Sequence, residues 1–231
     1  MNEFAGKHLL LVGTGGVKRR PVLEALRALG LRRVTCLHDR PNWAATLVDD
    51  WIEADSVTWS PSVLDLVRSR AHDLDGVLTY DDYSVVVAAH LAEALGHIGL
   101  SPETAKRAKN KPAMRALCRD RGLPAPRFVQ LDPWADDVAP ALAQARISFP
   151  VVAKPSHGAG SVLVRRADDL AELESTLREP YFMELGGQIP SALPQEAQAE
   201  LVRVASGVLA ALGVRDCCVH FEARWTARGA V

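Results

Sequence analysis

The spacing of hydrophobic positions changes several times along the first hundred residues. "KHLLLVG" at 7–13 contains a short apolar run typical of a buried strand, and "RVTCLH" at 33–38 also predicts a strand. "RRPVLEALRALG" at 19–30 has apolar residues at helical spacing. The same reading predicts strands at 55–59 and 76–81 and helices at 43–52, 61–74 and 84–96. Strands that alternate with helices predict parallel crossover connections, and therefore an open parallel α/β sheet.

A second unit is predicted after the polar helical stretch "SPETAKRAKNKPAMRALCRDRGL" at 101–123. Asn110 and Pro112 indicate a helix start inside this stretch, because asparagine caps helices well and proline suits their first turn. The pattern beyond it predicts strands at 127–131, 149–154, 161–164, 181–185 and 216–225, and helices at 135–146, 168–179 and 194–213.

Composition narrows the classes of function. The chain has 231 residues, of which 48% are hydrophobic and 24% charged, and its net charge is −1, as in ordinary globular proteins. The arginine pairs are scattered and form no basic stripe, so we expect no nucleic-acid partner. No apolar run has the length of a signal peptide or a membrane span. We therefore expect a cytoplasmic protein with no membrane partner.

The four cysteines carry little information about metal binding. None forms a C-x-x-C pair, and adjacent cysteines are poor chelators. They are predicted to be small buried hydrophobic residues in a reducing compartment; their positions are Cys36, Cys118, Cys217 and Cys218.

The glycine-rich stretch "LLLVGTGGVKRR" at 9–20 resembles part of a dinucleotide-binding turn. Gly13 and Gly15 fit the pattern G-x-G-x-x-G, but Lys18 occupies the third position, where a glycine allows close helix–strand packing. A tight turn that opens an α/β domain is the favoured interpretation. An NAD-binding oxidoreductase that uses the Gly13–Gly16 turn, with Asp39 after the second strand, is the alternative.

The stretch "FPVVAKPSHGAGSVLV" at 149–164 is a stronger candidate for phosphate binding. Lys154 ends a run of strand formers and supplies a point charge that suits a phosphate. The small residues that follow leave backbone N–H groups open to an anion. Lys111 adds a second ammonium group at a predicted helix start, where anions are already favoured. The alternatives are a plain hairpin and a solvated basic face.

The last predicted strand, "DCCVHFEARW" at 216–225, combines an apolar face with a polar one. Period-two alternation places Cys218, His220, Glu222 and Arg224 on the same face. A carboxylate there could hold Mg²⁺, which binds through one or two carboxylates together with substrate phosphates. A solvent-facing strand of mixed charge explains the pattern equally well.

Three features follow the α/β domain in a set order: Lys111 at a helix start, Lys154 before a glycine loop, and Glu222 late on a strand. Together they resemble the ATP-grasp superfamily of carboxylate–amine ligases, in particular its amino-acid (dipeptide) ligase, carnosine-synthase-like and biotin-carboxylase-like branch. The resemblance implies an N-terminal open parallel, Rossmann-like α/β domain at 1–102. It also implies an incomplete α+β ATP-grasp domain at 103–231.

The resemblance also implies roles for individual residues. Lys111 and Lys154 would contact ATP phosphates, Glu222 would be a magnesium ligand, and His220 and Arg224 would lie beside the site as catalytic residues. The phosphate flap would consist of Ser156, His157, Gly158, Ala159, Gly160 and Ser161. The implied reaction is phosphorylation of a carboxylate by ATP, followed by attack of an amine on the acyl phosphate. Both substrates would be small molecules, with amino acids expected, and a homodimer is left open.

Two departures from the family pattern limit this expectation. The helix after the flap joins the "FMELG" segment directly at Glu179–Pro180, where family members carry a longer stretch that holds adenine. The sequence also reaches its last residue shortly after the turn at Gly229. We therefore expect an internal deletion, a shortened C-terminus and no turnover by this chain as given. A degenerate nucleotide-binding remnant is the corresponding alternative.

Overall fold

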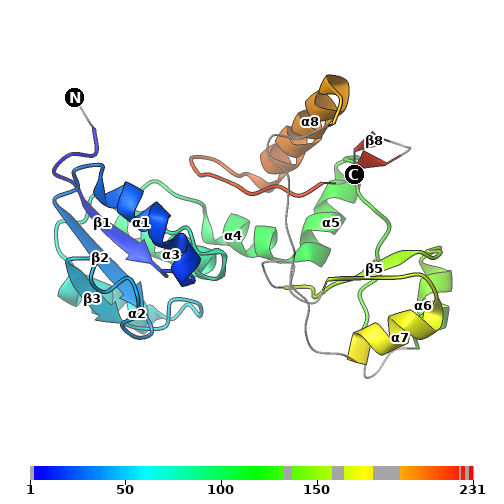
Figure 1. Ribbon diagram of the computed structural model, residues 1–231, viewed down its shortest axis with the longest axis horizontal. Helices are drawn as coiled ribbons and strands as arrows, with labels where there is room; N and C mark the ends of the chain where they lie inside the picture. The colour runs from blue at the N-terminus through cyan, green and yellow to red at the C-terminus, as the bar shows by residue number, and fades with distance from the viewer. Residues whose placement is uncertain are drawn as a thin grey trace. The chain divides into compact units, whose positions relative to one another are not determined.

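The computed structural model describes residues 3–132, 137–157, 164–178, 193–223, 225–226 and 229–230. The chain divides into two compact units, which Figure 1 shows as ribbons. Residues 1–106 and 215–217 form unit 1, and residues 107–214 and 218–231 form unit 2. The functional boundary expected at residue 102 rests on the family resemblance and stays a prediction.

A parallel sheet forms the centre of unit 1 (Figure 1). Its strand order is β3-β2-β1-β4, and all three pairings are parallel. This arrangement confirms the predicted open parallel α/β sheet. The strands are β1 (His8–Val12), β2 (Arg33–His38), β3 (Asp50–Glu53) and β4 (Gly76–Leu78).

Helices cover both faces of this sheet, because side chains along each strand point to alternate sides. Leu10 of β1 packs in a cluster with residues of α2 and α3, whereas the adjacent Leu11 packs in a second cluster with residues of α1. Both leucines are fully buried. The helical segments are η1 (Val17–Arg19), α1 (Arg20–Arg27), α2 (Pro61–Arg70), η2 (Asp82–Ser84) and α3 (Val85–Leu95).

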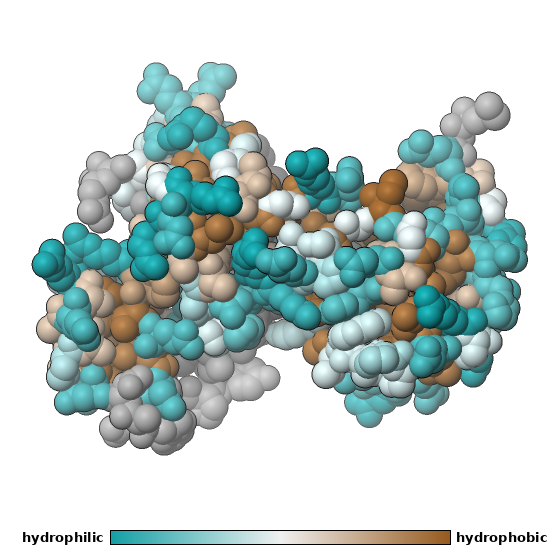
Figure 2. Space-filling model, turned by 180° about the vertical axis from the view of Figure 1, so that it is seen from behind, coloured by the Kyte–Doolittle hydropathy of each residue, from teal (hydrophilic) through white to brown (hydrophobic). Residues whose placement is uncertain are grey.

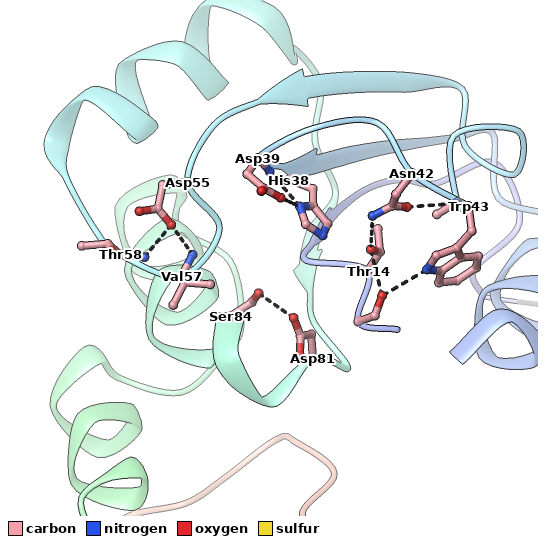
Figure 3. Close-up of polar contacts among 12 residues, drawn as sticks. Thr14, His38, Asp39, Asn42, Trp43, Asp55, Val57, Thr58, Asp81 and Ser84 are labelled. Carbon is pink, nitrogen blue, oxygen red and sulfur yellow. Dashed lines mark hydrogen bonds and ion pairs between the residues drawn. The ribbon is translucent and has the colours of Figure 1, made fainter. Parts of the chain in front are cut away.

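The turn after β1 confirms the favoured interpretation of the glycine-rich stretch. Gly13 has φ +73°, a left-handed conformation that suits glycine. Figure 3 shows how side chains hold the turn: Asn42 Nδ2 donates to Thr14 Oγ1 at 2.8 Å, and Trp43 Nε1 donates to the Gly15 carbonyl at 3.1 Å. These glycines therefore serve a packed turn within unit 1.

Two predicted elements of unit 1 are wrong. Residues 43–49 form turns and bends instead of a helix, and the third strand lies at Asp50–Glu53 instead of 55–59. The Asp55 carboxylate accepts hydrogen bonds from the N–H groups of Val57 at 2.7 Å and Thr58 at 2.9 Å. Such a local turn competes with strand pairing, which explains why 55–59 is not extended.

Unit 2 contains two packed clusters around short antiparallel hairpins. Strands β5 and β6 pair and pack with α6 and α7, while α5 and α8 pack with β8. The helices are α5 (Lys111–Asp120), α6 (Val138–Gln144), α7 (Leu170–Arg178) and α8 (Gln195–Leu212), and α4 (Pro102–Lys109) precedes them. The strands are β5 (Val151–Ala153), β6 (Arg165–Ala167), β7 (Trp225–Thr226) and β8 (Gly229–Ala230).

Two strand predictions in unit 2 are wrong, because residues 127–131 and 216–223 contain no strand. Strand β6, which pairs with β5, lies at Arg165–Ala167, and residues 161–163 of the return strand expected at 161–164 lie outside the described residues. The expected strand at 181–185 lies outside the described residues.

The prediction that all four cysteines are buried is also only half right. Cys36 and Cys118 are buried, but Cys217 and Cys218 are exposed. Burial raises the pKa of the Cys36 thiol to about 12, so this thiol is inert at neutral pH. Cys217 and Cys218 fall in residues 216–223, where the chain forms no strand and offers no buried face.

Gly229, which the sequence predicts in a turn, is the first residue of strand β8, and residues 227–228 before it lie outside the described residues. Strands β7 and β8 pair antiparallel, and Gly229 has φ +94°. The N–H group of Ala230 donates to Glu200 Oε1 of α8 at 3.2 Å, and the Ala230 side chain is buried against α8. Glu200 therefore attaches this hairpin to the helix.

Figure 2 shows mostly hydrophilic residues on the visible surface, with smaller brown patches of hydrophobic residues between them. Within the residues that the structure describes, no helix combines the length and the hydropathy needed to cross a bilayer. A cytoplasmic location stays a prediction.

Candidate nucleotide-binding site

The start of helix α5 has the predicted geometry. Asn110 is extended, and its side-chain oxygen accepts a hydrogen bond from the N–H group of Ala113 at 3.0 Å. Lys111 is the first helical residue and Pro112 follows it within the first turn. An asparagine cap of this kind contributes about 1 kcal/mol to helix stability. The cap therefore fixes Lys111 at a helix end that favours anions.

A backbone hydrogen bond connects this helix start to the loop that follows β5. The N–H group of Lys111 donates to the carbonyl oxygen of Ser156 at 3.1 Å. The Ser156 hydroxyl in turn lies 3.1 Å from Nδ1 of His157. Three of the predicted phosphate-binding residues are therefore adjacent, although 45 positions separate Lys111 from Ser156 in the sequence.

Lys154 lies directly after β5 and is exposed. Val151 and Ala153 of β5 pack in a cluster with Leu142 of α6 and Leu173 of α7. This packing holds the end of β5, where the loop begins. Lys154 lies two residues before Ser156, whose carbonyl accepts the hydrogen bond from Lys111. The remaining predicted flap residues, Gly158, Ala159, Gly160 and Ser161, lie outside the described residues.

Arg115 is a candidate that the sequence analysis missed. It follows Lys111 by four residues on α5, a spacing that places both side chains on one helix face. It is partly buried, and burial lowers the pKa of its guanidinium group. Within the described residues it forms no hydrogen bond or ion pair. The i, i+4 spacing in "KPAMR" is the sequence signal that could have identified it.

The predicted metal ligand and catalytic residues do not lie on a helix or strand of the described chain. His220 and Glu222 are exposed and lie in residues 218–223, which form no helix or strand, while Arg224 lies outside the described residues. No hydrogen bond of the described chain joins Glu222 to Lys111 or Ser156.

The described residues also contain no group of three His, Cys, Asp or Glu side chains that could hold a metal ion. A single carboxylate fits Mg²⁺ only where phosphates and water complete its shell.

The chain is similar in sequence and in fold to known enzymes. No family model matches the chain. It is 29% identical to carnosine synthase 1 of Gallus gallus over 292 aligned positions, which cover 97% of the chain and 31% of that enzyme. The chain thus spans about a third of the length of this relative. Because the alignment is longer than the chain of 231 residues, the chicken enzyme carries additional residues within the aligned region. The expected junction at Glu179–Pro180 lies outside the described residues.

Two solved structures have a similar fold. The L-amino acid ligase from Bacillus licheniformis superposes with a TM-score of 0.70 and 23% identity, over 91% of the chain and 61% of that structure. An N5-carboxyaminoimidazole ribonucleotide synthetase in complex with ADP gives a TM-score of 0.66 and 15% identity, over 91% of the chain and 64% of that structure. These similarities confirm the resemblance seen in the sequence: the chain is a relative of the ATP-grasp carboxylate–amine ligases.

Proposed function

We propose that unit 2 binds ATP with Mg²⁺ and that the chain derives from ligases that join a carboxylate to an amine. The observation that carries this proposal is the hydrogen bond from the Lys111 N–H group to the Ser156 carbonyl. It brings the helix start that carries Lys111 beside the loop that begins after Lys154. Two ammonium groups, a helix N-terminus and backbone N–H groups are the components of a triphosphate site.

In this proposal the protein acts mainly by positioning and by neutralising charge. Lys111 and Lys154 hold the phosphates, and Arg115 adds a partly desolvated positive charge on the face of α5 that carries Lys111. A bound Mg²⁺ would neutralise phosphate charge, with Glu222 as its protein ligand. The substrates would be a small carboxylate, activated as an acyl phosphate, and a small amine, with amino acids as the first candidates. A homodimer stays a prediction.

The first test separates nucleotide binding from turnover. We expect ATP with Mg²⁺ to raise the thermal midpoint of the full chain, because a ligand that binds only the folded state stabilises it by about 2.7 kcal/mol at 100 times Kd. NAD should leave the midpoint unchanged. Stabilisation by NAD but not by ATP would contradict the proposal and favour an oxidoreductase.

We expect the full chain to show no ligase turnover, even where it binds ATP. This chain lacks the additional residues that the chicken enzyme carries within the aligned region, so we expect it to have fewer groups that orient the nucleotide. Displacement of a reacting group by about 1 Å can lower the rate on the order of 10²-fold. Phosphate release with a panel of amino acids and ATP–Mg²⁺ measures this directly. Substrate-dependent release that disappears in Lys154→Ala would show instead that the chain is a working ligase.

Glu222→Gln tests the proposed metal ligand. We expect the variant to weaken binding of ATP in the presence of Mg²⁺ by about tenfold, a typical cost of disturbing a metal site. Binding of ATP in the presence of EDTA should not change, because the lost carboxylate acts only through the metal. Calorimetric titrations with and without Mg²⁺ measure the difference. Glu196→Gln, at an exposed position in the first turn of α8, is the control, and an equal loss in both variants would count against the assignment.

The structure weakens the NAD alternative. A side chain at Gly13 would overlap Ser84, so the first glycine of the turn is required by contacts inside unit 1. The dinucleotide pattern needs its glycines for close approach of a pyrophosphate, and no such role is needed to explain Gly13.

A further inference from the structure

Cys217 and Cys218 are consecutive thiols that have no part in the proposed nucleotide site. Both are exposed, within a run of exposed residues at 215–220. The other two cysteines, Cys36 and Cys118, are buried, and burial raises the pKa of each of these thiols. Because the thiolate is the reactive form of cysteine, the chain combines two inert buried thiols with two thiols that solvent and small molecules reach.

The chain itself fixes the distance between the two exposed thiols. Their residues are joined by a trans peptide bond, which places the two Cα atoms about 3.8 Å apart. A thiol that has reacted with an oxidant therefore has a second thiol beside it. Exposed cysteines with a neighbouring cysteine that resolves the oxidised form are typical of redox-sensing sites.

A disulfide between consecutive residues suits reversible oxidation better than it suits a structural role. The Cα atoms of disulfide-bonded cysteines usually lie about 4.4–6.8 Å apart, so closure of the ring between Cys217 and Cys218 strains the bond. Strained or exposed disulfides are the ones that thiols reduce readily. Residues 216–223 form no helix or strand, so no regular hydrogen bonds of such an element oppose the backbone adjustment that ring closure requires.

A metal ion is the other ligand that two thiols could hold. Structural zinc sites need four ligands. The described part of the chain contains no group of three His, Cys, Asp or Glu side chains that could hold a metal ion. Oxidation of the pair therefore explains its chemistry better than metal binding.

We infer that Cys217 and Cys218 form a redox-active dithiol that reacts with small disulfides of the glutathione type. The inference goes beyond the proposed function, because it requires neither a nucleotide nor a metal. In a reducing compartment the pair stays as two thiols, and an excess of oxidised disulfide converts it to the ring.

The reaction consists of two thiol–disulfide exchanges. The thiolate of one cysteine attacks a sulfur of oxidised glutathione, which gives a mixed disulfide and one glutathione thiolate that takes up a proton. The second cysteine loses its proton, and its sulfur attacks the protein sulfur of the mixed disulfide. This step releases the second glutathione. Two protein thiols are oxidised to one disulfide, and one oxidised glutathione is reduced to two glutathione molecules.

Intact-mass spectrometry of the full chain tests the inference by counting thiols. The reduced chain is incubated with excess oxidised glutathione, and the remaining thiols are then blocked with N-ethylmaleimide in denaturant. We expect the oxidised chain to carry no glutathione and only two N-ethylmaleimide groups, on Cys36 and Cys118, because the other two of its four cysteines are joined. Dithiothreitol added before the blocking step should restore all four groups.

Single variants separate ring formation from simple modification of an exposed thiol. Cys217→Ser and Cys218→Ser each leave one exposed thiol without a resolving partner. Each should hold at least about tenfold more glutathione as a mixed disulfide than the unmodified chain, where the second thiol attacks intramolecularly. The double variant should take up none. Cys118→Ala, which removes a buried thiol, is the matched control and should form the same ring as the unmodified chain.

Retention of four free thiols after oxidation would overturn the inference. So would glutathione that remains on the unmodified chain as it does on the single variants, disulfide-linked dimers in place of the ring, or oxidation of Cys36 or Cys118 in peptide maps. Circular dichroism should show that every variant is folded, as expected for serine at two exposed positions. None of these outcomes bears on ATP binding, which is measured separately.

Discussion

Gly13→Ala is expected to destabilise unit 1 by about 2–4 kcal/mol. Gly13 has φ +73°, where any L-residue other than glycine costs about 1–2 kcal/mol. A Cβ atom there would overlap the Ser84 hydroxyl and lie 2.9 Å from Ser84 Cβ. Ser84 is fully buried at the start of α3, so it cannot swing into solvent, and such overpacking costs about 1–3 kcal/mol. Urea unfolding monitored by circular dichroism measures the loss.

The same turn offers a matched control for this prediction. Gly16 has φ −73°, and a Cβ atom at this position would meet nothing within 4 Å. Gly16→Ala should therefore be neutral or stabilising by up to about 1 kcal/mol, because alanine restricts the unfolded chain. Combining Gly13→Ala with Ser84→Gly should recover the part of the loss that comes from overlap. Equal effects of the two single variants would show that neither backbone conformation nor Ser84 determines the role of Gly13.

The elements that the sequence predicts well are those with a strong local signal. Strand β1 contains a run of four apolar residues and β2 is rich in strand formers, and α3 ends at Gly96 in the left-handed conformation that glycine favours at helix ends. Asn110 and Pro112 likewise predict the start of α5, because capping depends only on adjacent residues.

The errors occur where partners distant in sequence decide the structure. Residues 43–52 have apolar residues at helical spacing, but Trp43, Leu47 and Trp51 pack from turns and a strand onto the α1 side of the sheet. Strand β3 is only four residues long and is stabilised by pairing with β2. A four-residue strand has too short a pattern to be distinguished from a helix segment.

The candidate nucleotide-binding site could be predicted in part from the sequence. Lys111 and the loop after Lys154 could be predicted as neighbours from their family resemblance, and the Lys111–Ser156 hydrogen bond supports that prediction.

Lys154→Ala is expected to weaken ATP binding by about 1.5–3 kcal/mol, or roughly 10- to 150-fold. Lys154 leaves β5 two residues before the carbonyl that binds the Lys111 N–H group. The backbone that follows Lys154 therefore contacts a helix N-terminus, and we expect the electrostatic energies of the ammonium group and of the helix end with a phosphate to add. Because Lys154 is exposed, removal of its side chain leaves no cavity, and the free energy of unfolding should change by less than about 0.5 kcal/mol.

Two further variants distinguish a phosphate contact from a general effect of charge. Lys154→Arg keeps the positive charge but replaces the compact ammonium group with a planar fork, so ATP affinity should fall less than in Lys154→Ala. Lys18→Ala removes an exposed lysine of unit 1 and should leave ATP affinity unchanged, apart from a small effect that salt screens. Calorimetry of each variant with ATP–Mg²⁺ measures these affinities. If Lys154→Ala binds ATP as tightly as the unmodified chain, the β5–β6 segment is a plain hairpin and its lysine is only a surface charge.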